Sequence, residues 1–238
     1  MKAVIDIILL IMIALCTWNG YRRGLVGGIS GMLAIIIALF GGSLLSSAYA
    51  HEVVPALEPF VDGYVDSQKN RLAIMDELGY GDSDLSIDDI LYQDSSLRYD
   101  YAYEAFRSLG VFSGTAEKLA VQAVETADAG EQDMTKAVVS VACDKASYVA
   151  GLALAFLMIL IFLIAIANVG NLSLRLPNME NLDEIGGAVI GFVKGFVLCV
   201  LLSWFLSFFG IIIGKDTLGD TTLARFFLAF DFIAGILL

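Results

Sequence analysis

Apolar residues dominate four stretches of the chain, and polar residues are concentrated between the second stretch and the third. The first two stretches lie within residues 3–45 and are separated only by the short polar link 19–24; the others cover residues 149–169 and 185–213. A bilayer core about 30 Å thick is crossed by roughly 20 helical residues, and these stretches approach or exceed that length with few charges. Because backbone groups in hydrocarbon must be paired within their own segment, the pattern predicts an all-α, polytopic membrane protein with four transmembrane helices in two pairs.

The polar stretch between the two pairs is also expected to be helical. Its apolar residues recur at helical spacing, and glycines at 79–81 and 110–114 interrupt the pattern. Short amphipathic helices need one another or a membrane face to bury their apolar sides, so a folded extramembrane region is expected rather than a disordered tether. The apolar positions that carry this expectation include Phe60, Tyr64, Tyr103, Phe106 and Leu109.

The end of the chain forms a further amphipathic segment. Residues 222–238 place several apolar side chains on one helical face but also contain Arg225 and Asp231. This length is short for a crossing, so an interfacial or re-entrant helix is expected. The predicted regions are 1–50 (first helix pair), 51–145 (acidic extramembrane region), 146–213 (second helix pair) and 214–238 (interfacial C-terminal helix).

Charge is distributed unevenly along these regions. The chain has 238 residues, of which 58% are hydrophobic, and a formal net charge of −12. Residues 51–145 contain 19 Asp and Glu against 7 Lys and Arg, a difference of −12 that equals the net charge of the whole chain. An acidic surface repels phosphate backbones, so no nucleic-acid partner is expected.

Two arginines determine the expected orientation. Lys and Arg in short loops near the ends of transmembrane helices are retained in the cytoplasm, whereas long loops cross largely regardless of charge. If the turn that contains Arg22 and Arg23 is cytoplasmic, both chain termini and the acidic region lie outside, and the link 170–184 is cytoplasmic. The expected location is the bacterial cytoplasmic membrane.

Residue types that carry chemistry are sparse. Cys16, Cys143 and Cys199 are far apart and His51 is the only histidine, so neither a disulfide framework nor a zinc site is expected. An EF-hand loop counted from Asp82 would need glycine at its sixth position and glutamate at its twelfth, where the chain has Ile87 and Gln93. Without a nucleophile motif or a phosphate-binding loop, no catalytic residue, cofactor or metal is expected, and an enzyme is the least supported class.

Glycines at four-residue spacing mark two of the predicted helices. In lipid, small residues four apart let two helix backbones approach closely and gain dispersion contacts. The second and fourth helices are therefore expected to be a close-packed pair, although glycine could instead provide flexibility or line a narrow path. The predicted helix-packing residues are Gly20, Gly24, Gly28, Gly187, Gly191 and Gly195.

If the protein transports an ion or a proton, charged residues inside the apolar stretches are expected to take part. Lys194 lies near the inner end of the fourth helix and Asp6 near the outer end of the first, so an ion pair between them is not expected. Together with Arg22 and Arg23 they are interpreted as interfacial anchors; the alternative is an ion or proton path.

These residues also carry a family resemblance. Asp6 in an apolar start, then Gly20-x-x-Arg23-Gly24, and later Gly186-Gly187-x-x-x-Gly191-x-x-Lys194-Gly195-Phe196 resemble the CvpA family of bacterial inner-membrane proteins, named for colicin V production. The resemblance covers roughly the first 50 residues and those from about 150 onward. It implies a multi-span membrane protein linked to toxin or bacteriocin production, with no catalytic residues to carry over.

Two functional hypotheses remain open at this stage. One is a non-enzymatic membrane scaffold or export accessory whose acidic outer region binds a partner. The other is a small oligomeric transporter or channel formed around the glycine-rich helices. The lipid bilayer is the expected environment, and a second copy of the chain or another membrane protein is a possible partner. Polar residues lining a path would separate the hypotheses, and the candidates are Asn168, Ser203 and Trp204.

Overall fold

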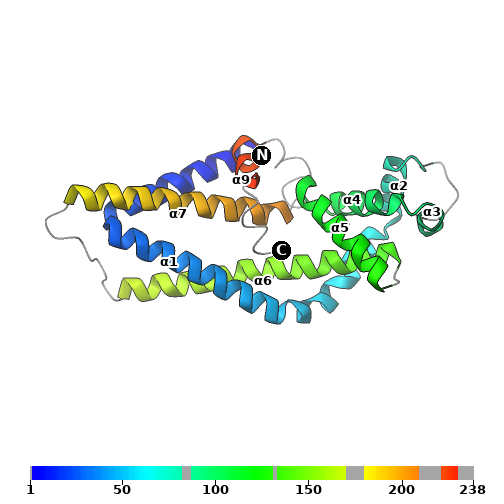
Figure 1. The fold of residues 1–238 in the computed structure, drawn as a ribbon, viewed down its shortest axis with the longest axis horizontal. Coiled ribbons are helices and arrows are strands. Elements are labelled where there is room, and N and C mark those ends of the chain that lie inside the picture. Colours follow the sequence, from blue (N-terminus) through cyan, green and yellow to red (C-terminus); the bar gives the residue numbers. More distant parts are fainter. Residues whose placement is uncertain (1, 82–86, 131–132, 170–179, 209–220, 230–238) are drawn as a thin grey trace. The chain divides into compact units, whose positions relative to one another are not determined.

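The computed structural model describes residues 2–81, 87–130, 133–169, 180–208 and 221–229, and all regular structure among them is helical. The helices are α1 (Lys2–Val65), α2 (Gln68–Glu77), α3 (Ile87–Gln93), α4 (Leu97–Ser108), α5 (Ser113–Gly130), α6 (Met134–Val169), α7 (Glu180–Phe208) and α9 (Thr222–Leu228) (Figure 1). The all-α prediction is confirmed for the described residues.

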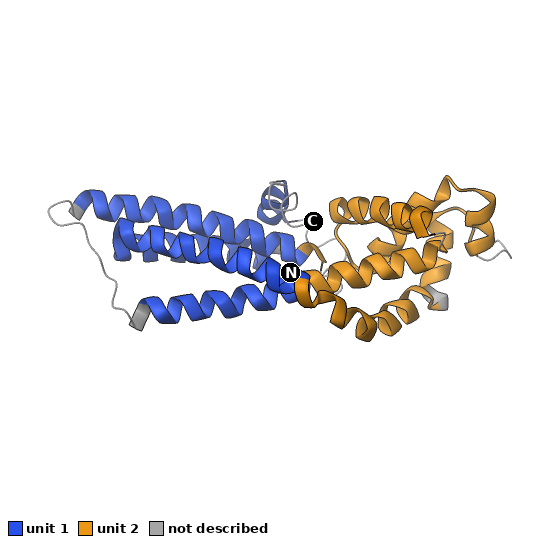
Figure 2. Ribbon diagram, turned by 60° about the horizontal axis from the view of Figure 1, so that its bottom comes forward, with its two compact units in different colours: residues 1–47, 150–206, 219–238 blue, residues 48–149, 207–218 orange. Residues whose placement is uncertain are grey.

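The chain forms two compact units (Figure 2). Unit 1 consists of residues 1–47, 150–206 and 219–238, and unit 2 of residues 48–149 and 207–218. The boundaries therefore fall within α1, α6 and α7.

Helix α1 is a hairpin of two helical arms joined at Gly24. Gly24 has φ 73° and ψ −178°, a backbone conformation that is essentially restricted to glycine. The first arm precedes Gly24, and the second arm begins at Leu25 and doubles back (Figure 1). The reversal needs no loop, because one glycine changes the chain direction.

Helix α7 packs against both arms of this hairpin. Gly20 and Gly187 pack backbone to backbone, and a Cβ added at Gly191 would lie 2.5 Å from the carbonyl oxygen of Cys16. A Cβ at Gly195 would lie 3.0 Å from Cα of Ile13. Glycines therefore line the contact between α7 and the first arm.

The contact between α7 and the second arm is less close. A Cβ at Gly28 would lie 3.2 Å from the side chain of Ile190 and 3.6 Å from the carbonyl oxygen of Gly187. The glycine spacing predicted that the closest contact joins the second and fourth predicted helices. In the structure it joins the first and the fourth, that is, the first arm of α1 and α7, because Gly20 precedes the Gly24 turn.

Helix α6 packs on the second arm of α1 farther from the turn. A Cβ at Gly42 would lie 3.1 Å from the backbone nitrogen of Phe156, and one at Gly151 would lie 2.8 Å from Oγ of Ser46. Near these contacts a small apolar core joins the second arm, α6 and α7 through Ile35, Ala38, Phe156 and Leu201.

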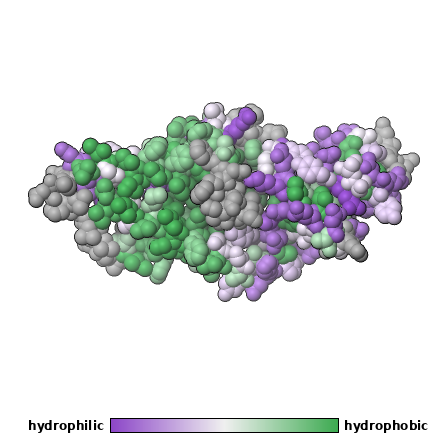
Figure 3. Space-filling model, viewed as in Figure 1, coloured by the Kyte–Doolittle hydropathy of each residue, from purple (hydrophilic) through white to green (hydrophobic). Residues whose placement is uncertain are grey.

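The outer surface of unit 1 is strongly apolar. Large apolar side chains point away from the core; Met158, for example, is 72% exposed. Figure 3 shows this apolar surface over the part of the chain that includes α7 and the adjoining arms of α1. Three helical stretches of the described residues are long and apolar enough to cross a membrane, namely Ala3–Val65, Met134–Ala167 and Asn181–Phe208. Apolar exposure on this scale requires a hydrocarbon environment.

Unit 2 has a separate hydrophobic core. Phe106 of α4 is fully buried, and Leu119 of α5 and Val138 of α6 are nearly so. The expected helical faces thus pack within unit 2 itself. The prediction was wrong for Phe60 and Tyr64, because their side chains are 77% and 44% exposed despite their helical spacing.

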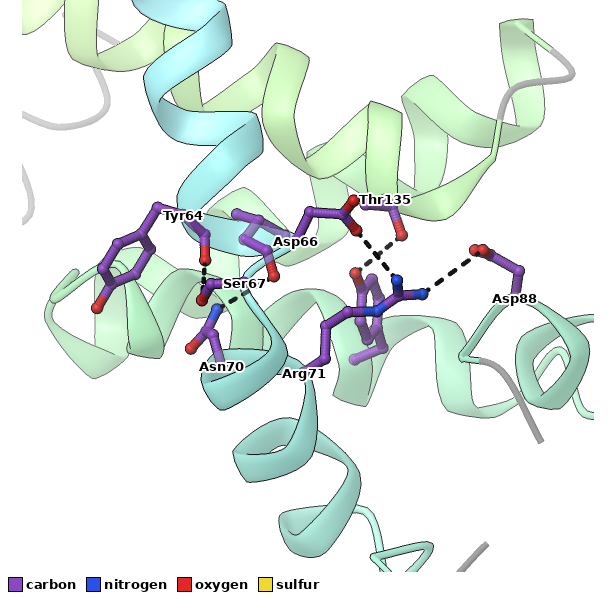
Figure 4. Close-up of polar contacts among 9 residues, drawn as sticks. Tyr64, Asp66, Ser67, Asn70, Arg71, Asp88 and Thr135 are labelled. Atoms are coloured by element: carbon purple, nitrogen blue, oxygen red, sulfur yellow. Dashed lines mark hydrogen bonds and ion pairs between the residues drawn. The ribbon is translucent and has the colours of Figure 1, made fainter. Parts of the chain in front are cut away.

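Polar contacts fix the helices around this core. Arg71 of α2 lies between Asp66 and Asp88, at N–O distances of 3.3 and 3.9 Å (Figure 4). The hydroxyl groups of Tyr101 and Thr135 share a hydrogen bond of 2.9 Å, which joins α4 to α6. Burial of Tyr101 raises the pKa of its hydroxyl, so it stays neutral at physiological pH.

The close contact of α7 with the first arm gives a stability prediction. Gly191→Ala should lower the free energy of unfolding by about 1–3 kcal/mol, because the added methyl group would force the two backbones apart. The measurement is thermal unfolding of the purified protein in detergent.

Gly63→Ala is the matched control. A Cβ at this helical position of α1 would meet nothing within 4 Å, and alanine is favoured over glycine in a helix by about 0.8–1 kcal/mol. Opposite signs for the two variants are expected. Equal stability of Gly191→Ala and wild type would show that the close glycine contact does not stabilise unit 1.

Candidate functional site

The Gly24 turn holds a buried carboxylate. Asp183, near the start of α7, is 4% exposed and packs directly against Gly24. Its Oδ1 accepts a hydrogen bond of 2.8 Å from the backbone N–H of Leu25. The first N–H groups of a helix have no partner within that helix, so Asp183 acts as an N-terminal cap supplied to the second arm by another helix.

The sequence pattern did not predict this role of Asp183, which stands in the polar link 170–184 before the fourth apolar stretch. An acid at that position is normally explained by the dipole of its own helix, so only the tertiary contact with Gly24 reveals the cap.

Cationic side chains surround the same turn. Arg22 and Arg23 are exposed at the end of the first arm. The side chain of Arg23 lies against Gly27, where an added Cβ would be 2.8 Å from Cβ of Arg23. Lys194 reaches from α7 to the second arm, and its Nζ lies 2.9 Å from the position of a Cβ at Gly31. Arg23 and Lys194 therefore contact Gly27 and Gly31, two glycines that are four residues apart on one face of the second arm.

Asp6, near the beginning of the first arm, supplies an acceptor to the start of another helix, as Asp183 does for the second arm. Its carboxylate accepts hydrogen bonds from the backbone N–H groups of Thr222 (3.4 Å) and Leu223 (3.1 Å), which begin α9. Helix α9 also packs through Phe227, whose ring meets that of Phe196 edge to face at 5.2 Å. Asp6 and Lys194 thus have different neighbours, and Asp6 fixes the short C-terminal helix to unit 1.

Unit 2 contains a pocket of about 520 Å³ that is lined by residues of α1, α5 and α6. His51 and Asp144 face each other there at 3.7 Å between Nδ1 and Oδ1, and Glu125 and Lys145 also line the pocket. Two carboxylates and two basic groups give it a mixed charge.

In the part of the chain that the structure describes, no group of three or more His, Cys, Asp or Glu residues could hold a metal ion, and all three cysteines are free. The acidic loop counted from Asp82 begins outside the described residues.

The hydroxyl groups and rings considered for a transport path are not exposed. Ser203 is fully buried in α7 and Trp204 is 5% exposed. The side chain of Asn168 lies outside the described residues.

The apolar surface of unit 1, its long apolar helices and the carboxylates that cap helix starts together define a multi-pass helical membrane protein. The family of the Colicin V production protein matches residues 5–74 and 111–231, which is most of the chain. The chain belongs to this family. No curated protein and no solved structure was found to match it.

The extent of the match corrects one expectation. The resemblance seen in the sequence covered roughly the first 50 residues and those from about 150 onward. The family match also includes residues 51–74 and 111–145, so within the acidic region only residues 75–110 lie outside it.

The cap from Asp183 gives a second prediction. Asp183→Ala should lower the free energy of unfolding by about 1–2 kcal/mol, because the N–H of Leu25 loses its acceptor in a buried setting. Asp183→Asn keeps an oxygen at the same position and should cost less than half as much. Thermal unfolding in detergent measures both, and an Asn variant as unstable as the Ala variant would contradict the hydrogen-bond explanation.

Proposed function

We propose that the protein is a non-enzymatic scaffold or export accessory in the bacterial cytoplasmic membrane, linked to toxin or bacteriocin production. The observation that carries the proposal is the division of roles between the two units. Unit 1 presents apolar side chains outward and uses the buried Asp183 and the partly exposed Asp6 to cap helices, whereas unit 2 is an acidic module with its own core. Membership of the Colicin V production protein family supports the link to toxin production.

The proposed topology has four crossings. The first arm of α1 rises about 33 Å from Lys2 to Arg23, which is enough for the hydrocarbon core, and the second arm returns after the Gly24 turn. Helices α6 and α7 supply the other crossings, and α9 lies at the interface. Arg22 and Arg23 favour a cytoplasmic turn, which places both termini and unit 2 outside.

Unit 2 is the proposed partner-binding part. Residues 51–145 carry the net charge of −12, so a basic peptide or a basic face of another membrane protein would be attracted to it. Such attraction mainly increases the association rate and decreases with salt.

Cysteine labelling tests this topology. Ser95 and Asn181 are exposed residues of unit 2 and of the start of α7. In a background with the three native cysteines replaced by serine, an impermeant thiol reagent added to intact cells should label Ser95→Cys and not Asn181→Cys. Permeabilised cells provide the control, in which both should react; the reverse pattern in intact cells would invert the proposed orientation.

Solute flux distinguishes the scaffold from the alternative, a small oligomeric transporter or channel. Ser203 and Trp204 are buried among apolar neighbours in α7, which supports a closed helix packing over a polar path. Liposomes containing the purified protein should therefore show the same K⁺, Na⁺ and H⁺ flux as empty liposomes. Flux that depends on the protein and falls in a Ser203→Leu variant would favour the channel.

A further inference from the structure

Two cations lie together on a glycine face of the α1 second arm. Arg23 packs against Gly27 and Lys194 against Gly31, and these glycines are four residues apart. One helical turn separates them, a rise of about 6 Å. Both glycines are half-buried. Because a glycine has no side chain, the side chains of Arg23 and Lys194 lie close to the helix backbone there.

The carboxylates near this face are used by other groups. Asp183 is buried against Gly24 and accepts the N–H of Leu25, and Glu184 hydrogen-bonds to the side chain of Tyr21. Among the described residues, neither Arg23 nor Lys194 forms an ion pair with a carboxylate. Within the described ranges, these two cations beside an apolar surface are therefore not paired with a carboxylate.

The glycines give the face its shape. An alanine at Gly27 would meet the Arg23 side chain at 2.8 Å, and one at Gly31 would meet Nζ of Lys194 at 2.9 Å. The absence of side chains there lets the stem of Arg23 lie along Gly27 and lets Nζ of Lys194 approach Gly31. A phosphate group can accept hydrogen bonds from a guanidinium and an ammonium at once.

We propose that Arg23 and Lys194 bind the phosphate group of an anionic phospholipid headgroup on the Gly27–Gly31 face. The site lies on the surface of unit 1, where Val193, next to Lys194 in α7, is exposed and apolar. Acyl chains would cover this side chain while the phosphate neutralises the two cations. Basic pockets between transmembrane helices bind anionic lipids in this way.

Lipid titration into the detergent-solubilised protein tests the proposal. Phosphatidylglycerol should raise the thermal unfolding midpoint at 0.5 M NaCl, where attraction between exposed charges is screened, and phosphatidylcholine should not. Arg23→Gln and Lys194→Gln should each weaken the apparent affinity for phosphatidylglycerol roughly five- to tenfold. The double variant should lose less than the sum of the two free-energy changes, because both side chains hold one phosphate.

Arg22→Gln is the matched control, since it removes the same charge from the adjacent position of the same arm. Its affinity at 0.5 M NaCl should equal that of wild type, and Lys194→Arg should keep most of the response. An equal loss in Arg22→Gln, or an unchanged response in the double variant, would overturn the proposed site. If inorganic phosphate alone stabilised the protein at the same phosphate concentration, the proposal that the bound phosphate group belongs to a lipid would be overturned.

Discussion

The contact between α7 and the first arm of α1 is the interaction on which the structure of unit 1 depends. Lipid tails are as apolar as leucine, so helices in a bilayer are not driven together by water. They gain instead from dispersion contacts, which weaken steeply with separation. Gly20, Gly187 and Gly191 let the two backbones meet directly, and this approach brings Asp183 to the Gly24 turn and Lys194 to the second arm.

Helix ends impose the second constraint. The hairpin in α1 has no loop that could pair the N–H groups at the start of its second arm, and α9 begins without a side-chain cap of its own. In both places a carboxylate from a distant helix supplies the acceptor, Asp183 for Leu25 and Asp6 for Thr222 and Leu223. Asp6, which the sequence offered as an ion-path candidate, and Asp183 therefore both have a structural use. A charge that stabilises a helix start cannot be removed without cost, and this favours packing over conduction as its role.

The sequence predicted those features that depend on local periodicity. Apolar length predicted the membrane helices, and glycine spacing predicted which residues lie where backbones approach. Which helices these glycines join was harder to predict from the sequence, since the position of the Gly24 turn decides whether Gly20 belongs to the first or the second helix. The cap from Asp183 joins residues 158 apart in the chain, and no local pattern encodes such a pairing. Phe60 shows the opposite failure, because its spacing predicts a buried face while its side chain is exposed.

Residues 75–110 bear on how the core of unit 2 is built. They lie outside the family match, yet they include Tyr101 and Phe106, which are among the largest fully buried side chains of the chain. Tyr101 reaches Thr135 of α6, and Arg71 of α2 pairs with Asp88 of α3, so the unmatched segment is bonded on both sides to matched residues. A segment that fills the core cannot be a free appendage. It contributes to the core of unit 2 although it lies outside the family match, whereas the long apolar helices lie almost entirely within the match.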